Sequence, residues 1–287
     1  MATYKKNRES KALELFQSLD KEQVNFVKLR KIEASYKIKH WIDFFEKISF
    51  MDEKGDGERK KWEKWRTASI IVAVLFFIFG FANYFLFVFT FIAIIGIFIF
   101  SNFVAKLKSI DVKNQLRLFI FPLLSFLKEE IDQEQKVYLH LDLSQINQEA
   151  YLKETIPVKS SALPKILTKI YELNWIKASM QMVDGTDIEW EITDKVRIRN
   201  ITKRGSSGKI KYKTKIKTKH TIILTSSFSK SKYTCIANPT EISPKSDSSN
   251  WVLRQKNKLV SLALDEVFQL EKLLEPIGNC YRKVKPL

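Results

Sequence analysis

An uncharged stretch constrains this chain more than any other feature of its sequence. Residues 67–105, between Arg66 and Lys106, contain no Asp, Glu, Lys, Arg or His. A helix of a soluble protein normally keeps one side in water, so an uncharged run of this length predicts a membrane segment. As one helix it would extend about 58 Å, nearly twice the ~30 Å hydrocarbon core of a bilayer. Two helical spans joined by a tight turn are therefore expected.

The turn of this transmembrane hairpin is expected near residues 80–84. Gly80 offers backbone freedom there, Asn83 a polar side chain, and Tyr84 an aromatic ring that favours the head-group region. Trp62 and Trp65 stand at the other end of the hairpin, before the uncharged run. We therefore predict Trp62, Trp65 and Tyr84 as membrane-interface residues.

The charge of the chain favours phosphate-bearing partners. Its 287 residues carry a formal net charge of +17, which suits anionic phospholipid head groups or nucleic acid. Basic residues also crowd both ends of the uncharged run, so the positive-inside rule places the N- and C-terminal parts in the cytoplasm. The charged N-terminus predicts no cleaved signal peptide, and the only cysteines, Cys235 and Cys280, fit a reducing compartment.

The sequence predicts an α+β membrane protein made of four segments. They are residues 1–64 (N-terminal cytoplasmic amphipathic helices), 65–105 (a transmembrane helical hairpin with spans at about 65–81 and 85–105), 106–131 (a cytoplasmic helical stalk) and 135–287 (a basic α+β cytoplasmic domain). Helical spacing of apolar residues continues from residue 8 to about residue 51. The glycine- and acid-rich residues 51–58 are expected to form a linker, and Pro122 is expected to interrupt the stalk.

The last segment changes to the two-residue period of a strand. Val137, Leu139 and Leu141 alternate with polar residues, which predicts one strand of an antiparallel sheet. A three-residue loop at 183–185 would pair Met180 with Ile188 and place their apolar side chains on one face. Two further helices are expected, a short one at residues 164–173 and a C-terminal one at residues 251–274 that covers the sheet.

A row of basic residues at every second position follows this predicted hairpin. Residues 195–232 contain thirteen Lys or Arg and no acid. Period two places alternate residues on one face of a strand. An odd-length loop near residues 205–208 would align the two basic rows, whereas a four-residue loop would set Ile198 among the lysines. We call the following nine residues the basic comb: Lys195, Arg197, Arg199, Lys209, Lys211, Lys213, Lys215, Lys217 and Lys219.

The basic comb has two interpretations. Lysines on an exposed edge strand block aggregation between sheets, and this protective role needs no ligand. Like charges on neighbouring strands cost stability, however, and their accumulation favours a surface for an anionic partner. Anionic phospholipid head groups or an acidic protein are the expected partners. Nucleic acid remains an alternative, although no stacking motif or zinc-finger spacing accompanies the comb.

The sequence shows no constellation typical of an enzyme. His40, His140 and His220 are scattered and have no metal-ligand spacing or adjacent nucleophile. The glycines at 205 and 208 lack the lysine and the following helix of a phosphate-binding loop. The acids of residues 51–58 do not match a calcium-binding loop. We therefore predict no catalytic residue, no metal ligand and no cofactor.

One block resembles a group of known sequences. The runs DGTDIEWEITDKVRIR and GKIKYKTKIK, together with the internal hydrophobic hairpin, resemble uncharacterised bacterial membrane proteins with a basic β-rich cytoplasmic domain. The resemblance covers residues 175–219. It implies a bacterial inner (cytoplasmic) or thylakoid-type membrane, and it implies no catalytic residue, ligand or partner.

The expected function is that of a non-enzymatic, two-pass integral membrane protein. Its basic domain would engage anionic lipid head groups or an acidic partner, as an anchor or adaptor. One alternative is a ligand-sensing, membrane-disrupting or channel-like effector whose spans oligomerise. A second alternative is a membrane tether for nucleic acid.

Overall fold

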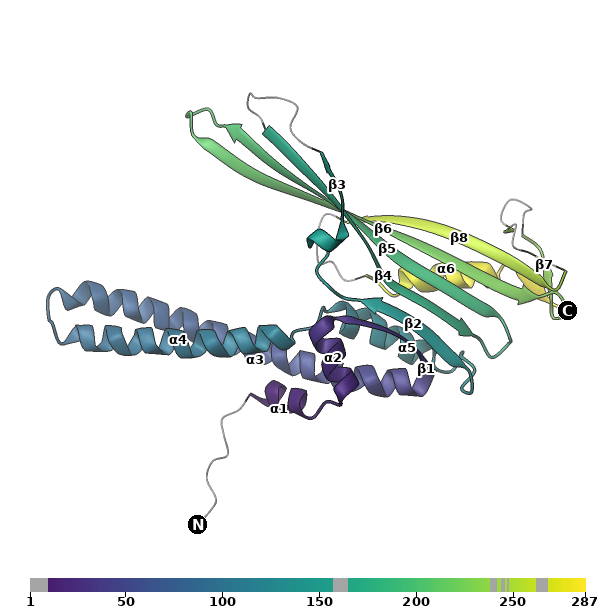
Figure 1. Cartoon of the computed structure of the whole chain (residues 1–287), viewed down its shortest axis with the longest axis horizontal. Coiled ribbons are helices and arrows are strands. Elements are labelled where there is room, and N and C mark those ends of the chain that lie inside the picture. Colours follow the sequence, from purple (N-terminus) through teal and green to yellow (C-terminus); the bar gives the residue numbers. More distant parts are fainter. Residues whose placement is uncertain (1–9, 157–164, 238–241, 244–245, 247, 262–267) are drawn as a thin grey trace, which may run out of the picture. The chain divides into compact units, whose positions relative to one another are not determined.

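The computed structural model describes residues 10–156, 165–237, 242–243, 246, 248–261 and 268–287. It contains helices and an antiparallel sheet, which confirms the predicted α+β class (Figure 1). The chain divides into two compact units. The helical unit contains Met1–Leu29 and Asp43–Arg117, and the sheet unit contains Arg30–Ile42 and Leu118–Leu287.

Four helices build the helical unit. They are α1 (Lys11–Gln17), α2 (Lys21–Leu29), α3 (Ile38–Gly80, which begins in the sheet unit) and α4 (Leu86–Ile110). Asp20 and Gln23 cap the start of α2 reciprocally, because each side chain accepts the backbone N–H of the other residue. The Gln23 amide is buried and donates to the carbonyl of Phe44 at 3.1 Å, which ties α2 to α3.

The expected linker at residues 51–58 is wrong, because α3 continues through it without a break. Met51 and Asp52 are buried on its inner face, and Gly55 lies against Ala12 of α1. Two helical glycines cost about 2 kcal/mol relative to alanine, which packing of this kind can offset. The acids also find basic partners across the helix surface.

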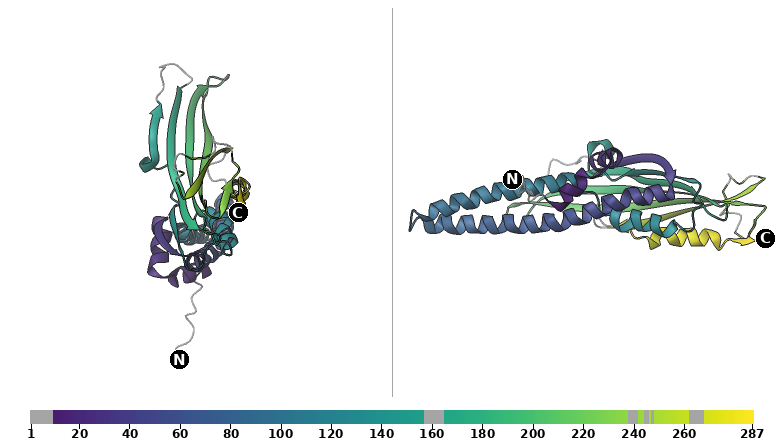
Figure 2. Two further views of the ribbon diagram at one scale, coloured as in Figure 1. Left: turned by 90° about the vertical axis from the view of Figure 1, so that its right-hand side faces the viewer. Right: turned by 90° about the horizontal axis from the view of Figure 1, so that it is seen from below.

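Helices α3 and α4 form an antiparallel hairpin with its turn at residues 81–85, at the expected place (Figure 2). Trp62 stacks on Phe103 with ring centroids 4.8 Å apart, and Phe76 stacks on Phe89 at 5.2 Å. Gly80 lets the ring of Phe87 pack closely at the turn, since a Cβ there would lie 2.8 Å from that ring.

In the described part of the chain, one helix is long and apolar enough to cross a membrane, α4. The uncharged part of α3, residues 67–80, is only fourteen residues long before the helix ends at Gly80. The second predicted span is therefore present as a helix of spanning length, and the first is a shorter apolar helical segment. Large apolar side chains are exposed along both, for example Phe79 and Phe98 at 58% and 72%.

The predicted stalk, residues 106–131, is a broken helix. Helix α4 ends at Ile110, and after an irregular connection a π-helical turn, η1 (Leu116–Ile120), leads into α5 (Phe121–Leu127). Pro122 lies in the first turn of α5, where its missing N–H is not needed. The change from π-helical to α-helical geometry therefore lies at the proline, within a continuous helical segment.

The sheet unit is built on one antiparallel sheet with the strand order β1-β2-β4-β5-β6-β8, and β3 pairs with β4. A separate pair joins β7 (Tyr233–Cys235) to β9 (Val284–Pro286). A 3-10 turn, η2 (Glu149–Tyr151), precedes β3, and a helix, α6 (Glu271–Tyr281), precedes β9. The strands of the sheet are β1 (Lys31–Lys37), β2 (Lys136–Asp142), β3 (Leu152–Ile156), β4 (Lys165–Gln181), β5 (Asp187–Arg204), β6 (Ile210–Ser229) and β8 (Asn250–Ser261).

Three helix predictions in this unit are wrong because strand pairing overrides local spacing. Residues 31–37 form the edge strand β1 on β2. Residues 165–173, expected in a short helix, belong to β4, and residue 164 lies outside the described residues. Residues 250–261 form β8 on β6, and the C-terminal helix is α6 instead. Residues 31–37 and 254–258 do show a period of two, which the helical interpretation of these segments overlooked.

The predicted β4–β5 register is confirmed. Met180 pairs with Ile188, Ala178 pairs with Trp190, and Gly185 adopts a φ of 86° in the connecting loop. The apolar face that results is buried. Helix α6 contacts this unit's sheet through Tyr281, whose ring lies 5.2 Å from that of Phe228 on β6, so a C-terminal helix does pack on the sheet as expected.

Gly57→Ala should test the continuity of α3. Gly57 is exposed and a Cβ there meets no atom within 4 Å, so alanine should raise the free energy of unfolding by about 1 kcal/mol. Gly185→Ala is the opposite case, because its positive φ should cost about 1 kcal/mol or more. Thermal unfolding in detergent measures both changes. An unaltered midpoint for Gly57→Ala would indicate a flexible linker.

Candidate anion-binding surface

The two basic rows lie on one face of the sheet. Strands β5 and β6 pair from Asp187↔Ser227 to Arg204↔Ile210, which leaves an odd, five-residue loop at 205–209. Lys195 therefore lies opposite Lys219, and likewise Arg197 faces Lys217 and Arg199 faces Lys215. The aligned register, one of the two that the sequence left open, is the observed one. The remaining comb residues on β6 are Lys211 and Lys213, and Lys209 ends the loop.

The comb lies on a part of the sheet with few neighbours. Strand β2 pairs with β4 only over Ile176–Ser179, and β8 pairs with β6 only from Thr218 onward. At the end of the sheet where β2 and β8 no longer pair, the described residues contain only strands β3, β4, β5 and β6. We call this four-stranded part the β arm (Figure 1). Lys211, Lys213, Lys215 and Lys217 are exposed there.

The comb is poorly neutralised by the protein itself. The Nζ of Lys195 lies 4.0 Å from a carboxylate oxygen of Glu172. No other comb residue forms an ion pair within the described ranges. The same face carries further acids away from the comb, for example Glu189 on β5, which pairs with Lys177 at 2.8 Å. This face of the sheet is therefore strongly basic around the comb and mixed in sign around Glu189.

A third basic row lies on β8, on the same face as the comb and beyond its last lysine. It was not predicted from the sequence. The register places Lys258 opposite Thr221 and Lys256 opposite Ile223, on the same face as the comb. Arg254 continues this row opposite Thr225. The period-two spacing of these three residues was the signal, but it was read as part of a helix.

The spacing of these charges suits several phosphate groups at once. Alternate residues on a strand are about 6.6–6.8 Å apart, and neighbouring strands are about 4.8 Å apart. The comb is thus a two-dimensional array of cations on one face of the sheet. Such an array attracts polyanions through the sum of its charges.

The structure places the residues predicted at the membrane interface at opposite ends of the hairpin. Trp65 is 54% exposed and Tyr84 is 85% exposed at the turn. Trp62 is only half-exposed, because its ring packs between Phe100 and Phe103. Trp62 therefore holds α3 against α4, in addition to any contact with a membrane.

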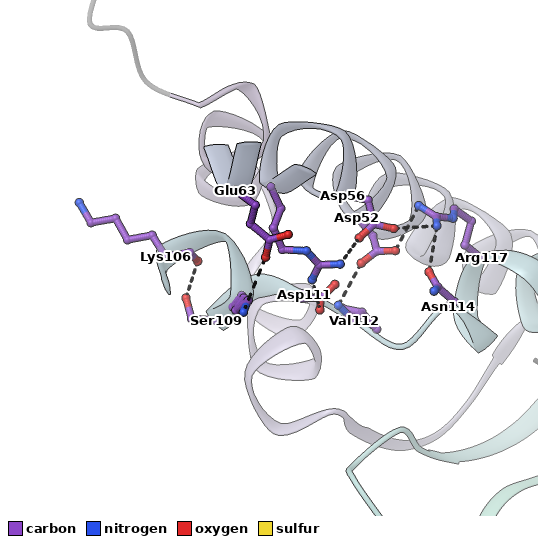
Figure 3. A network of polar contacts seen from close by, with 11 residues as sticks. Asp52, Asp56, Glu63, Lys106, Ser109, Asp111, Val112, Asn114 and Arg117 are labelled. Atoms are coloured by element: carbon purple, nitrogen blue, oxygen red, sulfur yellow. Dashed lines mark hydrogen bonds and ion pairs between the residues drawn. The ribbon is translucent and has the colours of Figure 1, made fainter. Parts of the chain in front are cut away.

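A network of five charged residues fastens the base of the hairpin (Figure 3). Arg117, beyond α4, lies 2.9 Å from Asp56 and 3.4 Å from Asp52, and Arg59 bridges Asp56 and Asp111 at 2.8 and 2.5 Å. The backbone N–H of residue 112 donates to Asp52 at 3.0 Å. Burial is the main reason why the pKa of Asp52 is raised to about 6. Among the described residues, no group of His, Cys, Asp or Glu is placed to hold a metal ion.

One histidine has a partner that the sequence did not reveal. His220 lies opposite Asp194 across β5 and β6, with Nδ1 2.6 Å from the carboxylate, and Trp175 donates its indole N–H to the same oxygen at 3.1 Å. The ring of Phe268 packs against His220 and Trp175. This buried cluster links three strand residues and a residue beyond β8. His140, by contrast, lies on the polar face beside Glu33.

The comparisons with known proteins leave function to be inferred from these residues. No family model, no curated protein and no solved structure matches the chain. The exposed, aligned comb and the apolar hairpin are therefore the features from which we argue.

The pKa of Asp52 makes stability depend on pH. Because the folded value of about 6 exceeds the ordinary 3.8, folding takes up a proton between these pH values. The contribution of Asp52 to the free energy of unfolding therefore falls, by up to about 3 kcal/mol, as the pH rises from 4 to 6. Asp52→Asn should remove this part of the pH dependence. Denaturant titrations of both proteins at pH 4 to 7 test it; parallel curves would contradict it.

Positive charges that face each other across β5 and β6 should lower the stability of the fold. Lys217→Glu places a carboxylate opposite Arg197, so the free energy of unfolding should rise by about 0.5–1 kcal/mol. Lys217→Gln, which only removes repulsion, should give a smaller increase. Both gains should shrink in 1 M salt, where the Debye length is about 3 Å. Chemical denaturation with urea at low and high salt measures them, and a loss of stability in Lys217→Glu would refute the repulsion.

Proposed function

We propose that this protein is a non-enzymatic membrane protein that uses the basic comb to bind phosphate groups of anionic lipid head groups or the surface of an acidic partner. The hairpin α3–α4 lies in a bacterial inner or thylakoid-type membrane, and both of its outer ends emerge on the cytoplasmic side. The comb then acts as an anchor or adaptor. The alignment of two basic rows on one exposed face carries this proposal.

Edge protection does not account for the whole comb. In the β arm, β6 has no described neighbour on its outer side, so its lysines are suited to protect an edge. Strand β5 is different, because β4 pairs with it on one side and β6 on the other. Lys195, Arg197 and Arg199 therefore lie on an interior strand, where no edge needs protection. An anionic partner gives these three residues a role.

Anionic lipid is favoured over a free polyanion because of the covalent link to the hairpin. A domain tethered to a membrane meets its lipids at a high effective concentration, so weak contacts suffice. Each basic residue near an anionic surface contributes about 1 kcal/mol. A nucleic-acid tether would use the same charges, but the aromatic residue within the comb region, Tyr212, is a single exposed ring and forms no row of stacking platforms.

A cavity gives some support to a ligand-sensing effector as the second candidate. Its volume is about 560 Å³, within the range of small-molecule sites. Glu130 and Asp184 are its acidic lining residues, which disfavours an anionic nucleotide and favours an apolar or cationic ligand. The apolar lining residues are Phe126, Leu127, Met182, Val183, Leu274 and Ile277.

Binding of anionic vesicles tests the proposed function. Full-length protein in neutral nanodiscs should sediment with vesicles that contain one-third anionic phospholipid, and salt should weaken binding steeply. Lys→Gln changes at Lys211, Lys213, Lys215 and Lys217 together should weaken it by about two to three orders of magnitude. The matched control changes four exposed lysines of other elements, Lys21, Lys28, Lys39 and Lys47, and should retain most of the affinity.

Three results would redirect the proposal. Equal binding to neutral and anionic vesicles would refute the lipid version. Capture of an acidic protein, lost in the comb variant but kept in the control, would favour a protein partner. A salt-sensitive shift of a random DNA duplex that exceeds vesicle binding would favour the nucleic-acid tether.

A further inference from the structure

Charged residues limit how deeply α3 enters a membrane. Its uncharged part runs from Thr67 to Gly80, and Lys64 and Arg66 lie immediately before it. At 1.5 Å per residue these fourteen residues extend about 21 Å. The hydrocarbon core of a bilayer is about 30 Å thick. The uncharged part of α3 is therefore about 9 Å shorter than a crossing along the membrane normal requires.

The longer apolar run of α4 does not add depth, because contacts with α3 fix its level. Gly96 lies against Ser69, and Trp62 stacks on Phe103. Near the base, Lys108 lies 3.7 Å from Glu63. These contacts place residues 99–105 of α4 beside residues 60–66 of α3, where the exposed side chains include Lys60, Lys61 and Lys64. The last third of the apolar run of α4 thus lies at the level of the charged end of α3.

Most backbone N–H groups of the turn find their partners within the hairpin itself. The Oδ1 atom of Asn83 turns back to accept the N–H of Phe85 at 3.1 Å. An unsatisfied N–H costs several kcal/mol in hydrocarbon, whereas a turn in water needs no internal partner. Phe81 and Phe85 are 73% and 65% exposed, and the turn has no charged residue. Further N–H groups donate to carbonyls of the hairpin itself, namely those of residues 82, 83, 86, 87 and 88.

We propose that the hairpin is re-entrant: both helices enter the bilayer from one face, and the turn at residues 81–85 stays inside the hydrocarbon without reaching water on the far side. The surface that it fits is a single face of a phospholipid bilayer. This inference rests on the membrane insertion in the proposed function. It differs from two complete spans in the final position of the turn, and it places Tyr84 below the head-group level that the sequence predicts for its ring.

Accessibility of a cysteine at the turn tests the depth. Tyr84 is 85% exposed, so Tyr84→Cys should fold normally. The background is full-length protein with Cys235→Ser, and Cys280 stays because it is fully buried. A membrane-impermeant maleimide, added to right-side-out or to inverted vesicles, should label Tyr84→Cys to less than a tenth of the level reached in detergent. Lys61→Cys, at the charged end, should be labelled from the cytoplasmic face, and the background protein gives the blank.

The labelling pattern separates failure of this inference from failure of the proposed function. Labelling of Tyr84→Cys from the outer face alone would show a complete crossing, which overturns the re-entrant hairpin and leaves membrane insertion intact. Labelling from the cytoplasmic face as efficient as that of Lys61→Cys would overturn both.

Fluorescence quenching provides an independent measure of depth. A fluorophore on the thiol of the Tyr84→Cys variant should be quenched most by lipids with a nitroxide on the acyl chain. Stronger quenching by a nitroxide on the head group would contradict a turn inside the hydrocarbon.

Discussion

The pairing of β5 with β6 is the constraint on which most of the sheet unit depends. Because side chains alternate along a strand, a shift of one residue would exchange the two faces. In the observed register, Trp190 lies opposite Leu224 in the core, while Arg197 lies opposite Lys217 on the polar face. The burial of the first pair fixes the alignment of the second. The apolar half of the ladder thus stabilises an arrangement that electrostatic repulsion in the basic half opposes.

The helical unit combines two surfaces that need different solvents. Around residues 67–99 the two long helices expose many apolar side chains that no other described residue covers, which suits lipid. At their base, Asp52, Asp56 and Arg117 form a network of ion pairs, which suits contact with water. The boundary between these regions lies within a few turns of helix. Because α3 continues as a helix through Gly55 and Gly57, it connects these two regions rigidly, whereas a flexible linker would let them move independently.

The sequence allowed part of this structure to be predicted with a physical reason. The helical hairpin, its turn, the β4–β5 register and the basic row along each of β5 and β6 all follow from local patterns: charge-free runs, a glycine with positive φ, and a period of two. The misplaced elements share another cause. Strand β1 gains its neighbours from a segment more than ninety residues away, and the pairing of β8 with β6 decided between two periods that its residues support equally well. The spacing of residues within a segment does not indicate which distant strand that segment will pair with.

Composition by itself determined that this chain has a long uncharged segment and an excess of basic residues, because both are properties of residue type and order. Tertiary structure decided what these features can do. Only the five-residue loop and its pairing set the two basic rows on one face. Only the contacts between α3 and α4 show that charged residues of one helix lie beside apolar residues of the other. The reason is that register and helix level are set by contacts between distant segments, which local sequence patterns do not specify.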